Sequence, residues 1–141
     1  MAATPPFNTI VDATIPGLQQ GKDAVISLRL TLPDGVTDPE RIKLELTDNI
    51  FMQVFQYYRR KEGDPFTLVA KFEVSGSDVT IIPNDHRFLL AISRTDTLPL
   101  KANQGEDKIR LFGTVYILRA NGSSRPSSKI DLSLPYEPAF L

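Results

Sequence analysis

Short runs in which apolar and polar residues alternate constrain the fold of this chain more than any other feature. The first run is "AVISLRLTL" at residues 24–32, in which every second position is apolar. Its inward positions are Ile26, Leu28, Leu30 and Leu32. Because successive side chains of a β-strand point to opposite faces, this spacing predicts a strand with one buried face.

The same kind of run recurs along the chain. We expect strands in residues 41–47, 66–74, 79–82, 87–93, 110–118 and 130–134. In residues 41–47, Ile42, Leu44 and Leu46 are expected to point inward. Turn residues separate the runs, such as "PDG" at 33–35 and "SGSD" at 75–78. About seven or eight short strands with frequent turns predict an all-β fold, an antiparallel β-sandwich or a small barrel.

Two stretches depart from simple alternation. Residues 48–64, "DNIFMQVFQYYRRKEGD", are rich in aromatic and β-branched residues, which favours a strand. Ile50, Val54 and Tyr57 also fit a helical stripe with Asp48 as its cap. We expect the strand. In residues 94–100, Thr95 or Asp96 is expected to cap one short helical turn that Pro99 ends.

Residues 110–118, "RLFGTVYIL", are apolar on both faces of the expected strand. One face carries Leu111, Val115 and Ile117, and the other carries Phe112, Tyr116 and Leu118. This pattern predicts a central strand that is covered on both sides. Gly113 is expected to allow a bulge or the close approach of a neighbour.

The first 20 residues differ in composition from the rest. Pro5, Pro6, Pro16 and Gly17 resist regular structure, and apolar residues lie among them. We therefore divide the chain into an extended N-terminal arm at residues 1–20, packed on its own domain or on a neighbour, and a β-sandwich domain at residues 21–141. A chain of 141 residues is long enough for one domain with a sizeable core.

The charge balance argues against several classes of partner. Sixteen basic and seventeen acidic side chains give a net charge of −1, so neither nucleic acid nor an anionic membrane surface is an expected partner. The chain lacks cysteine, which excludes disulfides and thiolate metal sites. Neither a secretory signal nor an apolar membrane span is visible in the sequence.

The residues that usually carry chemistry do not form a recognisable set. The single histidine, His86, has only Asp85 beside it and is interpreted as a turn residue. The aspartates of the turns lack the spacing of a calcium loop, and no nucleophile or phosphate-binding motif occurs. We expect no catalytic residue, no metal and no cofactor, and therefore not an enzyme. "YYRRK" at residues 57–61 is interpreted as a strand end or protein-contact patch rather than a nucleic-acid site.

Three segments resemble a known family. They are "KDAVISLRLTLPDGV" at 22–36, "FLLAISRTDTLPL" at 88–100 and "IRLFGTVYILRANGSSRPSSKIDLSL" at 109–134. Their order is similar to that of the immunoglobulin-like β-sandwich domains of phage tail and baseplate proteins, such as the N-terminal domain of siphophage baseplate upper proteins. The resemblance covers residues 21–135 and implies an immunoglobulin-like antiparallel β-sandwich.

The resemblance also implies a function. It indicates a non-enzymatic structural subunit of a phage or phage-like particle, made in the host cytoplasm and located in the virion. Its expected partners are other virion structural proteins and copies of itself, in a homo-oligomer or a larger assembly. The alternative is a module that binds carbohydrate or a host surface through the loop at residues 119–128. The residues expected to make partner contacts are Phe7, Ile10, Val11, Ile15, Tyr57, Tyr58, Phe140 and Leu141.

Overall fold

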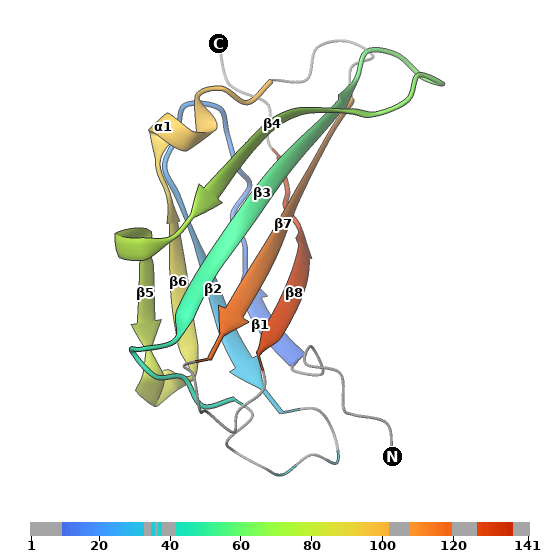
Figure 1. Cartoon of the computed structure of the whole chain (residues 1–141). Helices are drawn as coiled ribbons and strands as arrows, with labels where there is room; N and C mark the ends of the chain where they lie inside the picture. The colour runs from blue at the N-terminus through green and yellow to red at the C-terminus, as the bar shows by residue number, and fades with distance from the viewer. Residues whose placement is uncertain are drawn as a thin grey trace.

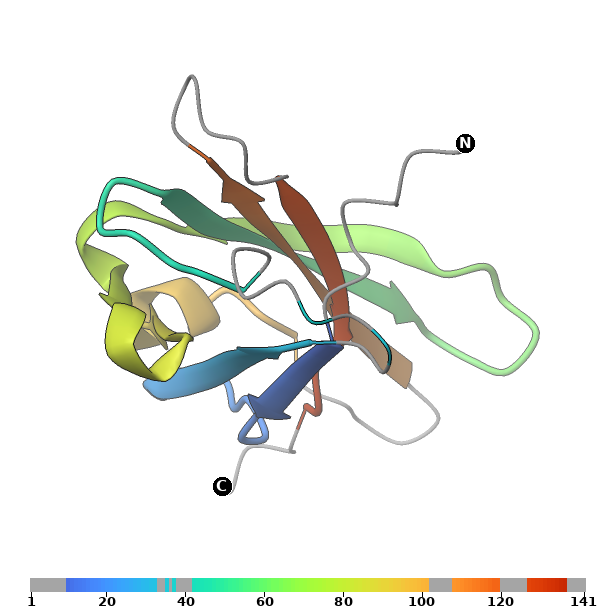
Figure 2. The ribbon, with the colours of Figure 1, turned by 90° about the horizontal axis from the view of Figure 1, so that it is seen from below.

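The protein is an all-β sandwich, as the alternating pattern predicted. The computed structural model describes residues 10–32, 35, 37, 42–101, 108–119 and 127–136. Two four-stranded antiparallel sheets face each other, one with the order β1-β2-β6-β5 and the other with the order β4-β3-β7-β8 (Figures 1 and 2). The strands are β1 (Ile10–Thr14), β2 (Ala24–Thr31), β3 (Asn49–Arg59), β4 (Thr67–Val74), β5 (Val79–Ile82), β6 (Arg87–Ile92), β7 (Lys108–Leu118) and β8 (Ser128–Ser133).

The core fills the space between the two sheets. In β2, Ile26, Leu28 and Leu30 are buried, as the alternation predicted. The other sheet contributes every second residue of β3 and β7. The buried apolar side chains of these two strands are Ile50, Met52, Val54, Leu111, Val115 and Ile117. Burial of this apolar surface is the main favourable term in folding.

The strand expected at residues 48–64 is present as β3, and the helical alternative is wrong. β3 pairs with β7 over its full length, from Asn49 opposite Leu118 to Arg59 opposite Lys108. Gln56 is the one polar residue on the inner face of β3. Its amide donates to Lys101 O and accepts from Lys101 N, each at 3.0 Å, so both polar ends of this buried side chain are satisfied.

Gly113 in β7 allows a close neighbour, as expected. A Cβ at this position would lie 2.8 Å from Met52 Sδ and 3.3 Å from Leu134 Cδ1.

The register of β3 against β4 shifts between Gln56 and Tyr57, which makes a β-bulge or irregularity in that ladder. β7 itself keeps a regular register with β3.

Two strand predictions are corrected. Residues 42–48 form turns rather than a strand: Leu44 is buried, whereas Leu46 is 75% exposed. Side chains, not a neighbouring strand, satisfy backbone groups here, since Arg119 donates to Lys43 O and Glu45 N donates to Asp48. β7 is central in its sheet as predicted, but it is not covered twice, because Phe112 is 39% exposed on its outer face.

The short helix α1 (Arg94–Thr97) lies where a helical turn was expected, but its cap was assigned to the wrong residue. Ser93 is the N-cap: its hydroxyl accepts from Asp96 N at 3.2 Å, and the Asp96 carboxylate accepts from Ser93 N at 3.3 Å. This reciprocal arrangement is a capping box. Pro99 follows the helix directly, as expected.

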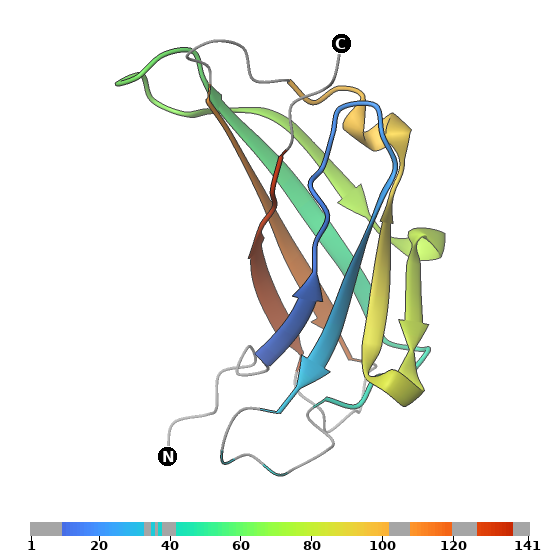
Figure 3. The same cartoon turned by 180° about the vertical axis from the view of Figure 1, so that it is seen from behind.

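The N-terminal segment is joined to the sandwich across the boundary expected at residue 20. β1 pairs with β2 of the same chain, from Ile10 opposite Thr31 to Thr14 opposite Ser27 (Figure 3). Leu18 is fully buried in the core, and its N–H donates to Pro135 O at 2.8 Å. β1 and the residues that follow it up to Leu18 therefore close the side of the sandwich next to β8.

Candidate functional site

The outer face of the β4-β3-β7-β8 sheet is aromatic. Since the buried residues of β3 and β7 alternate with the others, the remaining side chains point away from the core. We define the aromatic face as the outward residues Phe51, Phe55, Tyr57, Phe112 and Tyr116. Described segments do not cross this face in the view that looks onto it (Figure 1). A group of large apolar side chains on an outer surface commonly marks a contact site.

The rings of the aromatic face contact one another across the two central strands. Phe51 lies opposite Tyr116, and their ring centroids are 5.0 Å apart at an interplanar angle of 22°. This separation matches the distance between neighbouring strands, so the two rings stand side by side on the sheet. Phe55 lies opposite Phe112, which also meets Tyr57 edge-to-face at 6.0 Å. Such pairs fix the rings in position before any partner arrives.

A row of polar side chains crosses the sheet between the aromatic pairs. The ladders place Glu73 opposite Gln53, Gln53 opposite Thr114, and Thr114 opposite Asp131. Thr114 Oγ1 donates to Asp131 Oδ1 at 3.1 Å. Gln53 and Glu73 also line a hollow of about 430 Å³ together with Phe55, Lys71 and Phe72. The aromatic face therefore combines apolar rings with fixed charges of both signs.

Positive charge gathers at the end of the aromatic face where β3 ends. The guanidinium groups of Arg59 and Arg110 lie 4.8 Å and 4.1 Å from the centroid of the Phe66 ring. Arg59 also pairs with Glu62 at 2.9 Å. Tyr58 points to the opposite side of β3 from Tyr57, and the Lys101 ammonium lies 4.5 Å from its ring centroid. These cation–π contacts order the "YYRRK" segment through neighbouring side chains.

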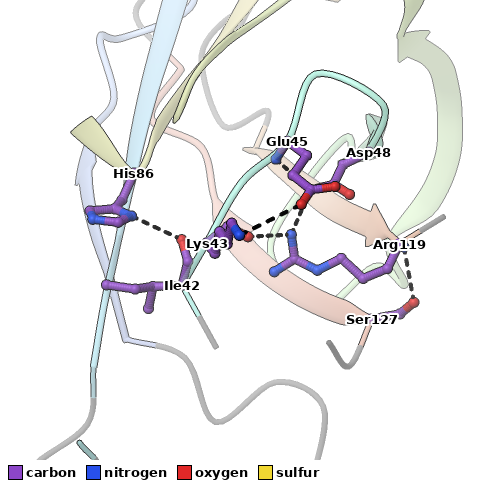
Figure 4. Close-up of polar contacts among 7 residues, drawn as sticks. All are labelled: Ile42, Lys43, Glu45, Asp48, His86, Arg119 and Ser127. Carbon is purple, nitrogen blue, oxygen red and sulfur yellow. Dashed lines mark hydrogen bonds and ion pairs between the residues drawn. The ribbon is translucent and has the colours of Figure 1, made fainter. Parts of the chain in front are cut away.

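A buried ion pair anchors the turns at residues 42–48, at one end of the sandwich (Figure 4). Arg119 Nη1 lies 2.7 Å from Asp48 Oδ2, and the two side chains are only 2% and 0% exposed. The same nitrogen donates to Lys43 O at 2.8 Å, and Asp48 Oδ2 accepts from Glu45 N at 2.9 Å. The pair is structural, because both charges are directed at each other and at backbone groups rather than at an open cleft.

His86 is a turn residue, as expected. It has a left-handed backbone with φ of 53°, a conformation in which histidine is enriched among non-glycine residues. Its Nδ1 lies 3.2 Å from Ile42 O (Figure 4). Groups of three or more histidine, cysteine, aspartate or glutamate residues able to hold a metal ion do not occur within the described part of the chain.

The carboxylate of Asp85 is held in its charged form by neighbouring arginines. Arg87 Nε donates to it at 2.7 Å, and this hydrogen bond is the main reason that its pKa lies below the ordinary value of 3.8. Partial desolvation, the next largest effect, raises the pKa, and the charges of Arg87, Arg29 and His86 lower it, so that the net shift of the pKa is downward.

We expect Arg87→Gln to raise the pKa of Asp85 toward its ordinary value. A lowered pKa means that the carboxylate stabilises the fold above about pH 3.8 and loses this effect as pH falls through the lowered value. An NMR titration of the Asp85 side-chain carboxyl carbon measures the shift. Arg94→Gln, in α1 beyond the other end of β6, is the matched control, and an equal shift of the Asp85 pKa in this variant would contradict the assignment to Arg87.

The residues predicted to make partner contacts lie in different parts of the structure. Phe7, Phe140 and Leu141 lie outside the described residues. Ile10 and Val11 belong to β1, and their backbone is paired with β2. Ile15 is half-buried and packs against the core, so it is directed into its own domain. Tyr57 belongs to the aromatic face, whereas Tyr58 lies against Lys101.

Sequence reasoning missed four members of the aromatic face as contact residues: Phe51, Phe55, Phe112 and Tyr116. Phe112 and Tyr116 lie in the "RLFGTVYIL" run, whose second apolar side predicts a buried layer, and Phe51 and Phe55 lie in residues 48–64. Only the burial of Leu111, Val115 and Ile117 shows that the second sheet lies on the other side of β7.

No protein-family model matches the chain, and no curated protein matches it either. Within the described residues, none of the helices is long and apolar enough to cross a membrane.

Proposed function

We propose that this protein is a non-enzymatic structural subunit of a phage or phage-like particle, in its tail, baseplate or capsid surface. It acts by protein–protein assembly, and its expected partners are other virion proteins and copies of itself. The observation that carries the proposal is the aromatic face, an ordered apolar surface on the outside of a β-sheet. Partner proteins gain about 25 cal/mol for each Å² of apolar surface that such a contact buries.

The ring geometry favours a protein partner over a sugar. A sugar ring stacks on the flat face of an aromatic ring, but Phe51 and Tyr116 each have one face turned to the other at 5.0 Å. Standing rings present mainly their edges to a partner, which suits interdigitation with side chains from another sheet. The loop proposed for carbohydrate binding at residues 119–128 is described only at residues 119, 127 and 128.

The strand order supports the resemblance to immunoglobulin-like virion domains. Lettered along the chain, immunoglobulin sandwiches place strands A, B, E and D in one sheet and C, F and G in the other. The sheet β1-β2-β6-β5 has the first arrangement, and β3-β7-β8 has the second, with β4 added beside β3. This likeness concerns the fold, and the assignment to a virion rests on the resemblance of the three sequence segments.

Purified particles test the proposal. Particles from the native source, separated on a density gradient, should contain this polypeptide in a stoichiometric amount that mass spectrometry detects. A tagged chain produced during particle formation should co-sediment with the particles, and Phe112→Lys should weaken this incorporation. Val25→Lys is the matched control, because Val25 is 52% exposed on β2 of the opposite sheet. If the protein is absent from every particle fraction, the proposal is wrong.

A further inference from the structure

The charges on the aromatic face are arranged in rows that are complementary to themselves. On β4, Lys71 lies opposite Phe55 and Glu73 lies opposite Gln53, so opposite charges occupy neighbouring rows of the same edge. On the other edge, Asp131 shares the row of Glu73 and Ser133 shares the row of Lys71, while Lys129 lies in the next row, that of Phe51 and Tyr116. The pattern therefore changes sign along the strands and not across them.

We propose that two copies of this chain associate through the aromatic face about a two-fold axis that runs across the strands, between the rows of Gln53 and Phe55. The proposal deepens the assembly function by naming the partner as a second copy and by fixing its orientation. A two-fold interface uses the same patch on both protomers, so each contact occurs twice. Rotation about this axis places Lys71 of one protomer against Glu73 of its partner.

The alternative axis, parallel to the strands, is disfavoured by the same charges. It would place β4 of one protomer over β8 of its partner and bring Glu73 opposite Asp131 in both halves of the interface. Like charges in direct opposition cost binding free energy and exclude wrong arrangements. The charge pattern therefore selects one of the two simple ways of stacking this sheet on itself.

The aromatic residues fit the selected orientation. The axis exchanges the row of Phe51 and Tyr116 with the row of Tyr57 and Arg110. Phe51 then meets Tyr57, and Arg110 lies opposite Tyr116, whose phenolic oxygen can accept a hydrogen bond from the guanidinium. The rows of Gln53 and Phe55 exchange with each other, which lays the Phe55 ring over the polar side chain beside the hollow.

The size of the face sets the expected strength of association. Four strands cover about 19 Å across, and seven residues cover about 24 Å along a strand. A face of this size lies at the lower end of specific protein interfaces. We therefore expect a reversible dimer that forms at micromolar concentration in isolation and is reinforced where many copies meet in a particle.

Sedimentation of the full chain over a range of concentrations tests the dimer. The wild-type protein should shift from monomer to dimer as concentration rises, and Phe112→Lys should weaken the association by at least about tenfold, whereas Val25→Lys should not. Thermal unfolding followed by circular dichroism verifies that each variant is folded. A monomer at all concentrations overturns the proposal, as does a dimer that Phe112→Lys leaves unchanged.

A charge exchange tests the orientation. Lys71→Glu and Glu73→Lys should each weaken the dimer by about tenfold, because each places like charges together in both symmetry-related contacts at the β4 edge. The double variant Lys71→Glu/Glu73→Lys should recover the wild-type affinity. Failure of the double variant to recover overturns the proposed axis. A monomeric protein that still appears in purified particles would overturn the dimer alone and leave the virion assignment intact.

Discussion

Replacing Arg119 with methionine is expected to lower the free energy of unfolding by about 3–5 kcal/mol, because it removes a cation that is paired with the buried carboxylate of Asp48. Both side chains are almost fully buried and 2.7 Å apart. Methionine keeps the apolar stem of arginine and removes the charge. The loss therefore measures the removed charge and its hydrogen bonds rather than a cavity.

The same substitution also removes a donor from the turns at residues 42–48. Arg119 Nη1 donates to Lys43 O, and these turns carry Leu44 into the core. We expect the denaturant midpoint to fall without a large change in slope, since the exposed area on unfolding stays similar. The double variant Arg119→Met/Asp48→Leu should recover part of the loss, although Glu45 N–H then loses its acceptor.

An exposed ion pair provides the control for Arg119. Arg59 and Glu62 lie a similar 2.9 Å apart, but the Glu62 side chain is 82% exposed. Glu62→Gln should cost less than about 1 kcal/mol, because water screens an exposed pair. Urea unfolding of the three variants measures the difference. Similar losses for Arg119→Met and Glu62→Gln would contradict the view that burial makes the Arg119–Asp48 pair important.

The alternation of apolar residues was enough to predict the sandwich, because most strands bury one face. It failed at residues 41–47, where Leu44 is buried, Ile42 packs against the core and Leu46 is exposed. The pattern of Ile42, Leu44 and Leu46 is the same as in a true strand. Long-range contacts such as those of Arg119 with Lys43 O and Asp48 help to hold this segment in turns, and sequence spacing carries no information about them.

The aromatic face could be predicted only in part. Its residues on β3 and β7 lie at alternate positions, so the sequence predicts that Phe51, Phe55 and Tyr57 share a side. Whether that side faces a second layer or the surface depends on which strands pair, and pairing is a property of the whole chain. The burial of the side chains shows the answer, since Val54 and Val115 are fully buried and the second sheet therefore lies against their face.

Substitutions at two phenylalanines, one in the core and one on the aromatic face, should separate effects on folding stability from effects on association. Phe88 on β6 is fully buried, between Leu28 on β2 and Ile81 on β5 in the sheet ladder. Phe88→Ala should lower the free energy of unfolding by about 3–5 kcal/mol, because it removes a large core side chain and leaves a cavity. Phe88→Leu should lose less, since leucine fills much of the same volume.

Phe112 carries the opposite expectation. It is 39% exposed and contacts Tyr57 on the aromatic face, so Phe112→Ala should cost about 1 kcal/mol of folding stability, the size of a cross-strand aromatic pair. The same change should weaken the dimer, which Phe88→Leu should leave intact. Chemical unfolding of Phe88→Ala, Phe88→Leu and Phe112→Ala measures their stability. Sedimentation of Phe88→Leu and Phe112→Ala measures their association. If Phe112→Ala destabilised the fold as much as Phe88→Ala and left association unchanged, the outer ring would be part of the fold rather than of a contact surface.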